Sequence, residues 1–196
     1  MKKLRMFMIA LMGVVLSSQA VFAATYTVDP DHTSVSFKVR HMLTNVQGQF
    51  KTFEGSFVYD PAKPETWNVK GAIQTASIDT NVAERDKHLR SPDFFDVEKY
   101  PTISFISTGV TDVTPTSAKM QGFLTIKGVE KPVVLDTEIL GVAKDPWGNV
   151  SASFTATAKI NRKDFGLTWN EVLETGQLLV GEEVWITLEV SGLLKE

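Results

Sequence analysis

The chain has 196 residues, with 20 Lys and Arg against 23 Asp and Glu, 3 His and no cysteine. This length fits one domain, because single β-barrels and β-sandwiches often reach about 200 residues. Without cysteine, the sequence excludes disulfide scaffolds, thiolate zinc sites, iron–sulfur clusters and cysteine nucleophiles. A formal charge of −3 also argues against a nucleic-acid-binding protein, whose electrostatic footprint is normally strongly basic.

The first 23 residues have the three-part pattern of a secretory signal peptide. A basic start precedes an apolar run over 6–16, and Val21-Phe22-Ala23 places small residues where a signal peptidase cleaves. A transmembrane anchor is the alternative, but about a dozen apolar residues are too short to cross about 30 Å of hydrocarbon. We therefore predict cleavage after Ala23. The mature chain 24–196 then has a formal charge of −6, because removal of the leader takes away three basic residues and no acidic one. No stable insertion of the mature chain into a membrane is expected.

The remaining sequence reads as strands separated by turn residues. Apolar and polar residues alternate most clearly over 151–160, where every second residue from Ala152 to Ile160 is apolar. The composition does not shift along the mature chain, so we predict a single all-β domain. The expected strands are 35–39, 53–59, 69–78, 102–110, 122–127, 133–142, 151–160 and 184–190.

One segment, 81–90, breaks the β pattern because it is polar and rich in helix formers. Asn81 is expected to cap a helix, with a glutamate three residues later completing a capping box. Ser91 is expected to cap a second short helix that carries Phe94 and Phe95. A helical insertion that ends in two adjacent Phe, within an all-β chain, is expected to cover one end of a barrel.

An antiparallel sheet of about eight strands must protect its edges, and closure into a barrel does this most completely. A barrel of that size either fills with its own side chains or encloses one elongated ligand. Ala152, Ala156 and Ala158 share one face of their strand and would leave room inside. Small residues also line tightly packed sandwich cores, so the alternation alone leaves both interiors open.

Short motifs follow one another in order along the mature chain. They include Ser77-Ile78-Asp79-Thr80, Glu84-Arg85-Asp86-Lys87-His88-Leu89, Asp93-Phe94-Phe95-Asp96, Gly122-Phe123-Leu124-Thr125-Ile126-Lys127-Gly128 and Ile160-Asn161-Arg162-Lys163-Asp164-Phe165-Gly166. By these motifs the chain resembles the YceI-like family (UPF0312), periplasmic lipocalin-like proteins that bind polyisoprenoids. One departure is Thr33 after His32, where the family usually has Ser, and the hydroxyl is retained.

The resemblance implies an eight-stranded antiparallel lipocalin-like barrel with a short helical insertion at one end. It also implies a periplasmic location and an apolar tunnel that holds a polyprenyl compound or an isoprenoid quinone. No cofactor is expected besides that lipid, and a homodimer stays open.

Inward apolar residues of the strands and aromatic residues near the helical insertion are the expected tunnel lining, although each could equally be ordinary core. They are Phe37, Val39, Phe57, Ile73, Phe94, Phe95, Phe105, Leu124, Ile126, Phe154, Phe165, Trp169, Ile186 and Leu188. Arg85 and His88 are candidates for contact with a polar head group, whereas Glu84 and Asp86 are expected to brace the insertion.

Enzymatic function finds little support in the sequence. The chain has no Gly-x-Ser-x-Gly elbow, no His-Glu-x-x-His motif and no Walker loop. Its three His are scattered, so we expect no metal site and no catalytic residues. Asp29 or Asp31 with His32, and Asp86 with His88, could serve as acid–base pairs beside a substrate. A lipid- or quinone-modifying enzyme that uses the same tunnel is therefore the second hypothesis. A module with a filled barrel that binds protein partners is the third.

Overall fold

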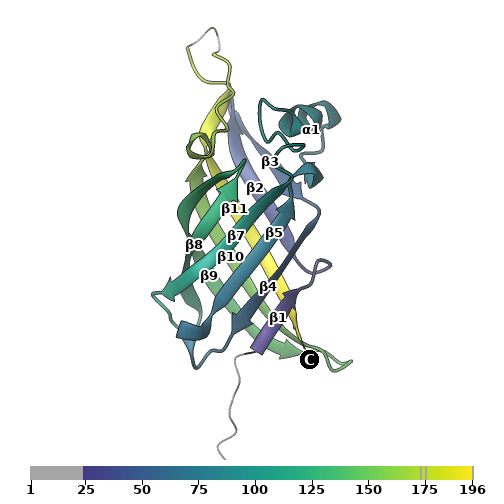
Figure 1. Ribbon diagram of the computed structural model, residues 1–196, viewed down its shortest axis with the longest axis vertical. Helices are drawn as coiled ribbons and strands as arrows, with labels where there is room; N and C mark the ends of the chain where they lie inside the picture. The colour runs from purple at the N-terminus through teal and green to yellow at the C-terminus, as the bar shows by residue number, and fades with distance from the viewer. Residues whose placement is uncertain (1–23, 173, 175, 196) are drawn as a thin grey trace, which may run out of the picture.

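The described chain forms one antiparallel sheet of 11 strands that closes on itself as a barrel (Figure 1). The computed structural model describes residues 24–172, 174 and 176–195, so the expected signal peptide lies outside the described residues. The strands are β1 (Ala24–Val28), β2 (Ser34–His41), β3 (Thr44–Phe50), β4 (Phe53–Tyr59), β5 (Asn68–Gln74), β6 (Ile78–Asp79), β7 (Thr102–Thr111), β8 (Ser117–Ile126), β9 (Val129–Lys144), β10 (Val150–Asn161) and β11 (Val180–Leu194). The helices are α1 (Ala83–Arg90) and the short 3-10 helices η1 (Pro64–Thr66), η2 (Thr75–Ser77) and η3 (Arg162–Phe165).

Three pairs of consecutive strands each occupy one position in the barrel wall. β1 and β2 both run antiparallel to β11, β3 and β4 continue each other beside them, and β5 and β6 pair with β4 and β3. Together with β7 to β11 they make eight positions, and the pairing of β1 with β11 closes the ring. The expected eight-stranded antiparallel barrel is therefore confirmed.

The break between β1 and β2 stays attached to β11 through a side chain. Pro30 has no amide hydrogen, so it cannot continue the ladder. Thr33 Oγ1 donates to the Ser191 carbonyl at 3.1 Å and accepts from the Ser191 amide at 3.1 Å. The Asp29 amide also donates to Ser191 O at 2.8 Å. The hydroxyl at position 33 therefore replaces a backbone pair, which both Ser and Thr can do.

The structure divides the wall differently from the sequence pattern in two places. The expected strand 69–78 is interrupted by η2 and becomes β5 and β6. β1 and β3 are strands that the pattern did not single out.

The reversal between β8 and β9 takes only Lys127 and Gly128, whose φ angles of 50° and 75° are those of a tight hairpin. A Cβ at position 128 would lie 2.7 Å from the Tyr100 ring. Glycine is therefore required both by the positive φ and by the lack of space beside this ring.

The helical insertion is present as α1, which lies at one end of the barrel (Figure 1). Two details of its expected form are wrong. Asn81 does not cap it, because its φ is 63°, a left-handed value that Asn tolerates, and Val82 stands at the cap position. No helix begins at Ser91, where the Phe94 and Asp96 amides both donate to its carbonyl in consecutive turns.

Side chains of α1 bind it to the wall through neighbouring backbone. Asp86 is buried and accepts from the Thr80 amide at 2.9 Å and the Thr80 hydroxyl at 2.5 Å. Arg90 donates to the carbonyls of Ala76 at 2.7 Å and Ile78 at 2.6 Å. The helix is therefore held by hydrogen bonds to the segment that leads into it. Within the described residues, no helix is long and apolar enough to span a membrane.

An aromatic cluster fills the other end of the barrel, near the start of β1. Tyr26 stacks on Phe57 at 5.1 Å, and Phe57 meets the edge of Phe154 at 5.3 Å. Tyr59 lies 5.0 Å from Phe154 and 4.8 Å from Trp67, whose indole N–H donates to the Asp60 carbonyl at 2.7 Å. We call these five rings the aromatic floor, because they close this end with packed side chains.

Gly192 of β11 provides the space that the aromatic floor needs. A Cβ at this position would lie 2.5 Å from the Phe57 ring. We predict that Gly192→Ala lowers the free energy of unfolding by about 1–3 kcal/mol, because Phe57 is held between two other rings and cannot move aside. Gly109→Ala is the matched control, since a Cβ there has nothing within 4 Å. Urea unfolding midpoints measure both, and equal midpoints would contradict this packing.

A second prediction concerns the ion pair between Asp29 and His32 at the β1–β2 break. The hydrogen bond that His32 Nδ1 donates to the Asp29 carboxylate at 2.6 Å raises the pKa of His32 above its ordinary 6.5. The contribution of His32 to stability is therefore complete below pH 6.5 and is lost as the pH rises through the raised pKa. An NMR titration should show this pKa falling in Asp29→Asn and changing much less in Asp31→Asn, whose charge is the smallest contributor. The reverse order would refute the assignment.

Candidate functional site

The barrel encloses a cavity of about 640 Å³ that runs from the aromatic floor toward α1. Its lining comes from every position of the wall, from α1 and from the segment after η3, and most of it is apolar. The volume is within the range of about 300–1,000 Å³ typical of small-molecule sites. The interior is therefore a tunnel with one end closed by packed rings. Of the two interiors that the sequence left open, the structure has the cavity and not the filled core.

Thirteen of the fourteen side chains expected in the tunnel lie along its lining. The exception is Phe165, which is 2% exposed and packs in the core beside Ile78 and Ile160 instead. Their role as ligand contacts stays a prediction. The thirteen are Phe37, Val39, Phe57, Ile73, Phe94, Phe95, Phe105, Leu124, Ile126, Phe154, Trp169, Ile186 and Leu188.

Several lining residues were missed by sequence reasoning. Val46 and Phe50 belong to β3, which was not recognised as a strand, although they alternate with polar residues on either side. Tyr59 and Trp67 sit at or beyond the end of an expected strand and line the floor end of the tunnel. Ala156 and Ala158 line the tunnel as their small size indicated, whereas Ala152 is packed below it in the core.

The mouth of the tunnel is covered by three rings from two separate segments. His88 of α1 meets the edges of Phe94 at 5.0 Å and Trp169 at 4.9 Å, and Phe94 lies 5.2 Å from Trp169. His88 Nε2 also lies 3.0 Å from the Asp93 carboxylate, which is more than half exposed. Two of the expected lining residues and one head-group candidate therefore meet at one point above the tunnel.

Arg85, the other head-group candidate, lines the mouth and is already braced. Its Nε donates to Thr80 Oγ1 at 2.7 Å and its Nη2 to the Thr80 carbonyl at 2.8 Å. Thr80 is thus shared between Arg85 and Asp86, so these two side chains hold α1 to the wall. Glu84 lies at the mouth with an exposed side chain.

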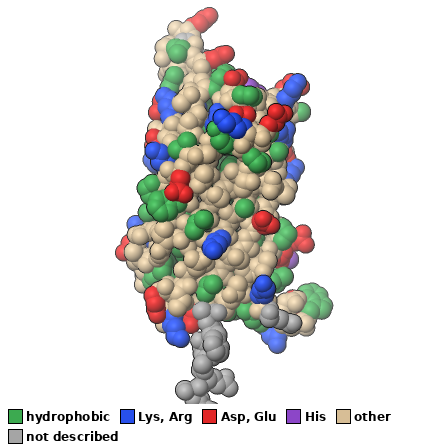
Figure 2. All heavy atoms as spheres, in the orientation of Figure 1, with side chains coloured by type: hydrophobic (Ala, Val, Ile, Leu, Met, Phe, Trp, Pro, Cys, Tyr) green, Lys and Arg blue, Asp and Glu red, His purple; other side chains and the backbone are tan. Residues whose placement is uncertain are grey.

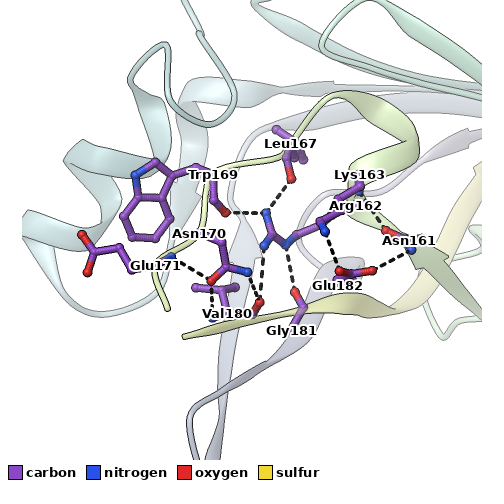
Figure 3. A network of polar contacts seen from close by, with 10 residues as sticks. All are labelled: Asn161, Arg162, Lys163, Leu167, Trp169, Asn170, Glu171, Val180, Gly181 and Glu182. Carbon is purple, nitrogen blue, oxygen red and sulfur yellow. Dashed lines mark hydrogen bonds and ion pairs between the residues drawn. The ribbon is translucent and has the colours of Figure 1, made fainter. Parts of the chain in front are cut away.

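Arg162 is a buried cation at the mouth that sequence reasoning did not assign a role (Figure 3). Its Nη1 donates to the carbonyls of Leu167 at 2.5 Å and Trp169 at 2.8 Å, and its Nε and Nη2 reach Gly181 O at 2.8 Å and Val180 O at 3.3 Å. Burial lowers the pKa of this guanidinium, which the charge of Glu182 partly offsets. The planar fork of Arg suits several carbonyls at once, so one side chain fixes the segment after η3 to the start of β11.

The same segment places Trp169 over the tunnel. Gly166 ends η3 in the left-handed conformation with a φ of 75°, and Asn161 caps its start by accepting from the Lys163 amide at 3.0 Å. Figure 3 shows the Trp169 indole directed toward α1 while its carbonyl turns back to Arg162. The lid residue and the buried cation are therefore parts of one arrangement.

The tunnel suits an apolar molecule, because most of its lining is apolar. Within residues 24–172, 174 and 176–195, no group of three or more His, Asp or Glu side chains is arranged to hold a metal ion. The polar side chains that line the cavity near α1 stand at its mouth, where they can meet the polar end of a bound molecule. A closed antiparallel barrel with a packed floor, an apolar tunnel and a helix-covered mouth defines the class of lipocalin-like barrels.

Comparison with known proteins specifies the family within this class. The sequence profile of the YceI-like domain matches residues 26–192, so the chain belongs to the YceI-like family. A UPF0312 protein of Azotobacter vinelandii is 43% identical over 162 residues, which cover 81% of this chain and 84% of the relative. The crystal structure of the YceI protein of Campylobacter jejuni is 34% identical, with a TM-score of 0.70 over 80% of this chain and 90% of the other.

A third similarity is one of fold alone. The structure of a polyisoprenoid-binding domain from Saccharophagus degradans has a TM-score of 0.63, covering 89% of this chain and 100% of that domain. The two sequences are only 12% identical. The barrel is therefore conserved in shape where little sequence is shared.

The Arg162 network gives a prediction for stability. In Arg162→Met the buried carbonyl of Leu167 and the partly buried carbonyls of Trp169 and Gly181 lose their donor, and each loss at a buried group costs about 1–3 kcal/mol. We expect a total loss of at least about 3 kcal/mol in the free energy of unfolding. Lys163→Met is the neighbouring control, because it removes only a half-exposed ion pair with Glu182, and such surface pairs contribute little to stability. Urea denaturation measures the free energy of unfolding of both variants. Equal losses would contradict a stabilising role of the Arg162 hydrogen bonds.

Proposed function

We propose that this protein is a periplasmic carrier that holds one long isoprenoid lipid in the tunnel and acts by binding, without chemistry. The cargo is a polyprenyl compound or an isoprenoid quinone. The observation that carries this proposal is the shape of the interior, which has an apolar bore, a packed floor and one covered mouth. A linear apolar chain with one polar end matches that shape.

The energetics of such a ligand support tight binding without charged contacts. Each methylene group removed from water contributes roughly 0.8 kcal/mol, so a chain of many carbons supplies a large driving force. The loss of translational and rotational freedom on association offsets several kcal/mol of it. Specificity then rests on the length of the tunnel and on polar groups at its mouth.

Two further observations support this assignment. The Saccharophagus degradans domain with the same fold is described as polyisoprenoid-binding, and this chain shares its closed barrel. The N-terminal segment 1–23 has the pattern of a cleavable export signal, which agrees with a periplasmic location. Arg85 and His88 lie at the mouth and are the proposed contacts for the polar end of the lipid.

A lipid- or quinone-modifying enzyme is the second candidate, and one observation favours it. His88 and Asp93 form a pair at the mouth, where the polar end of a bound lipid would lie. The pairing of His88 with Asp86 that the sequence offers is not formed, because Asp86 accepts hydrogen bonds from Thr80. Conversion of a bound lipid by the purified protein, abolished in Asp93→Asn, would replace the carrier proposal with this one.

Blocking the tunnel tests the proposal directly. Ala158 faces the cavity from β10, and the adjacent Thr157 is exposed on the outside of the same strand. We expect Ala158→Trp to weaken binding of an added polyprenol or isoprenoid quinone by at least about tenfold, because the indole occupies the bore. Thr157→Trp should bind as the parent does.

The measurement is fluorescence or calorimetric titration of the three proteins, with urea unfolding as a check that each is folded. Equal affinities in all three would place the lipid outside the tunnel and end the proposal.

A further inference from the structure

Four exposed apolar side chains stand at the mouth end of the barrel. Leu43 is 77% exposed and Met42 is 47% exposed, at the tip of the β2–β3 hairpin. Val172 is 70% exposed and Leu178 is 42% exposed, in the hairpin-like segment that precedes β11. Side chains this large and this exposed are unusual at two neighbouring tips. We call Met42, Leu43, Val172 and Leu178 the apolar rim.

The two tips of the apolar rim are joined to each other. The Met42 amide donates to the Leu179 carbonyl at 2.9 Å, and Val172 and Leu178 form an isolated antiparallel bridge. Figure 1 shows the segment before β11 projecting beyond the barrel at the end where α1 lies. In Figure 2 this projection carries hydrophobic side chains with acidic ones beside them.

The apolar rim is continuous with the lining of the tunnel. His41, directly before Met42, and Leu179 and Val180, directly after Leu178, all line the cavity. His41 and Val180 are also paired across β2 and β11. An apolar molecule leaving the tunnel past Leu179 and Val180 therefore meets the side chains of the apolar rim.

The turn that presents the rim breaks the usual rules of turn chemistry. Met42 and Leu43 form a two-residue hairpin turn, in which Met42 has a φ of 48°. Glycine and asparagine are the residues that adopt this conformation at little cost, and exposed turns are normally polar. A strained turn with two apolar side chains in water costs stability, and departures of this kind from the usual turn chemistry are expected at functional sites.

We propose that the apolar rim docks on a phospholipid bilayer, with its side chains in the acyl region and the tunnel mouth facing the membrane. This proposal depends on the carrier function, since it supplies the path by which a water-insoluble cargo enters without crossing water. Glu171 and Glu174 are exposed beside the rim and Arg40 lies behind it. The surface is therefore not a basic patch, and apolar insertion rather than attraction to anionic lipids is the proposed source of binding.

The opposite end of the barrel supplies the matched control. Trp147, in the β9–β10 turn, is 85% exposed and is the most exposed large apolar side chain described. It lies beside the ends of β1 and β11, where the aromatic floor closes the tunnel. A lipid cannot pass at that end, so docking there would serve no transfer.

Flotation with vesicles tests the proposal. The probes are vesicles of phosphatidylcholine alone and of phosphatidylcholine with phosphatidylglycerol, mixed with the protein as its host cell produces it. The double variant Leu43→Ser with Val172→Ser removes the two most exposed rim side chains, and Trp147→Ser is the control. We expect the double variant to lose at least about tenfold in vesicle partitioning, while Trp147→Ser matches the parent on both kinds of vesicle.

Four outcomes would overturn the proposal. They are no vesicle binding by the parent, equal binding by the double variant, binding that needs phosphatidylglycerol, and loss of binding in Trp147→Ser. If instead the parent is an oligomer that the double variant converts to a monomer, without vesicle binding, a second copy of the chain occupies the rim. Loading with polyprenol from detergent is measured separately and should be equal in parent and double variant. A parent that fails to load with polyprenol would refute the carrier function. The vesicle result would still decide whether the apolar rim docks on a bilayer.

Discussion

The barrel depends on β11, the strand where the sheet closes. One of its edges pairs with β10 from Asn161 to Ser151, and the other pairs first with β2 and then with β1. Without this double pairing, β1 and β2 on one side and β10 on the other would be open edges in a small antiparallel sheet. Closure of the sheet is therefore what encloses the cavity.

Both ends of the tunnel are built on the two ends of this strand. At its start, the carbonyls of Val180 and Gly181 accept from Arg162, which also holds the backbone of Trp169 above the mouth. Near its end, Gly192 leaves the space into which Phe57 stacks. Between them the small side chains of β10 keep the bore open. The same strand therefore defines a fixed floor and positions the cover of the mouth.

Much of the fold follows from local patterns in the sequence. Alternation over 151–160 placed Ala156 and Ala158 inside, and the polar segment 81–90 marked the helix, because both signals are carried by neighbouring residues. What failed is a detail of the local backbone. Asn81 adopts a left-handed φ of 63° and its amide donates to Asp79 Oδ1 at 2.8 Å, so it cannot cap the helix, and no capping motif reveals this.

The candidate site was also predicted only in part from the local sequence pattern. Period-two patterning found most of the lining, because inward and outward residues alternate in any strand of a barrel. Phe165 was misplaced because η3 turns it into the core beside Ile78, and a 3-10 turn after a strand has no clear apolar period. Arg162 has no recognisable partner in the sequence, since all its partners are main-chain carbonyls. The resemblance to the YceI-like family indicated the fold, whereas the closed floor and the hydrogen-bonded mouth depend on side-chain contacts that no sequence motif reveals.

An isoprenoid lipid in the tunnel should be present in the protein that the host cell produces. Native mass spectrometry of that protein, followed by organic extraction and identification of the lipid, measures this. We expect one isoprenoid per chain, released when the protein unfolds. A protein that is empty as isolated and also refuses added polyprenol and quinone would rule out the carrier function.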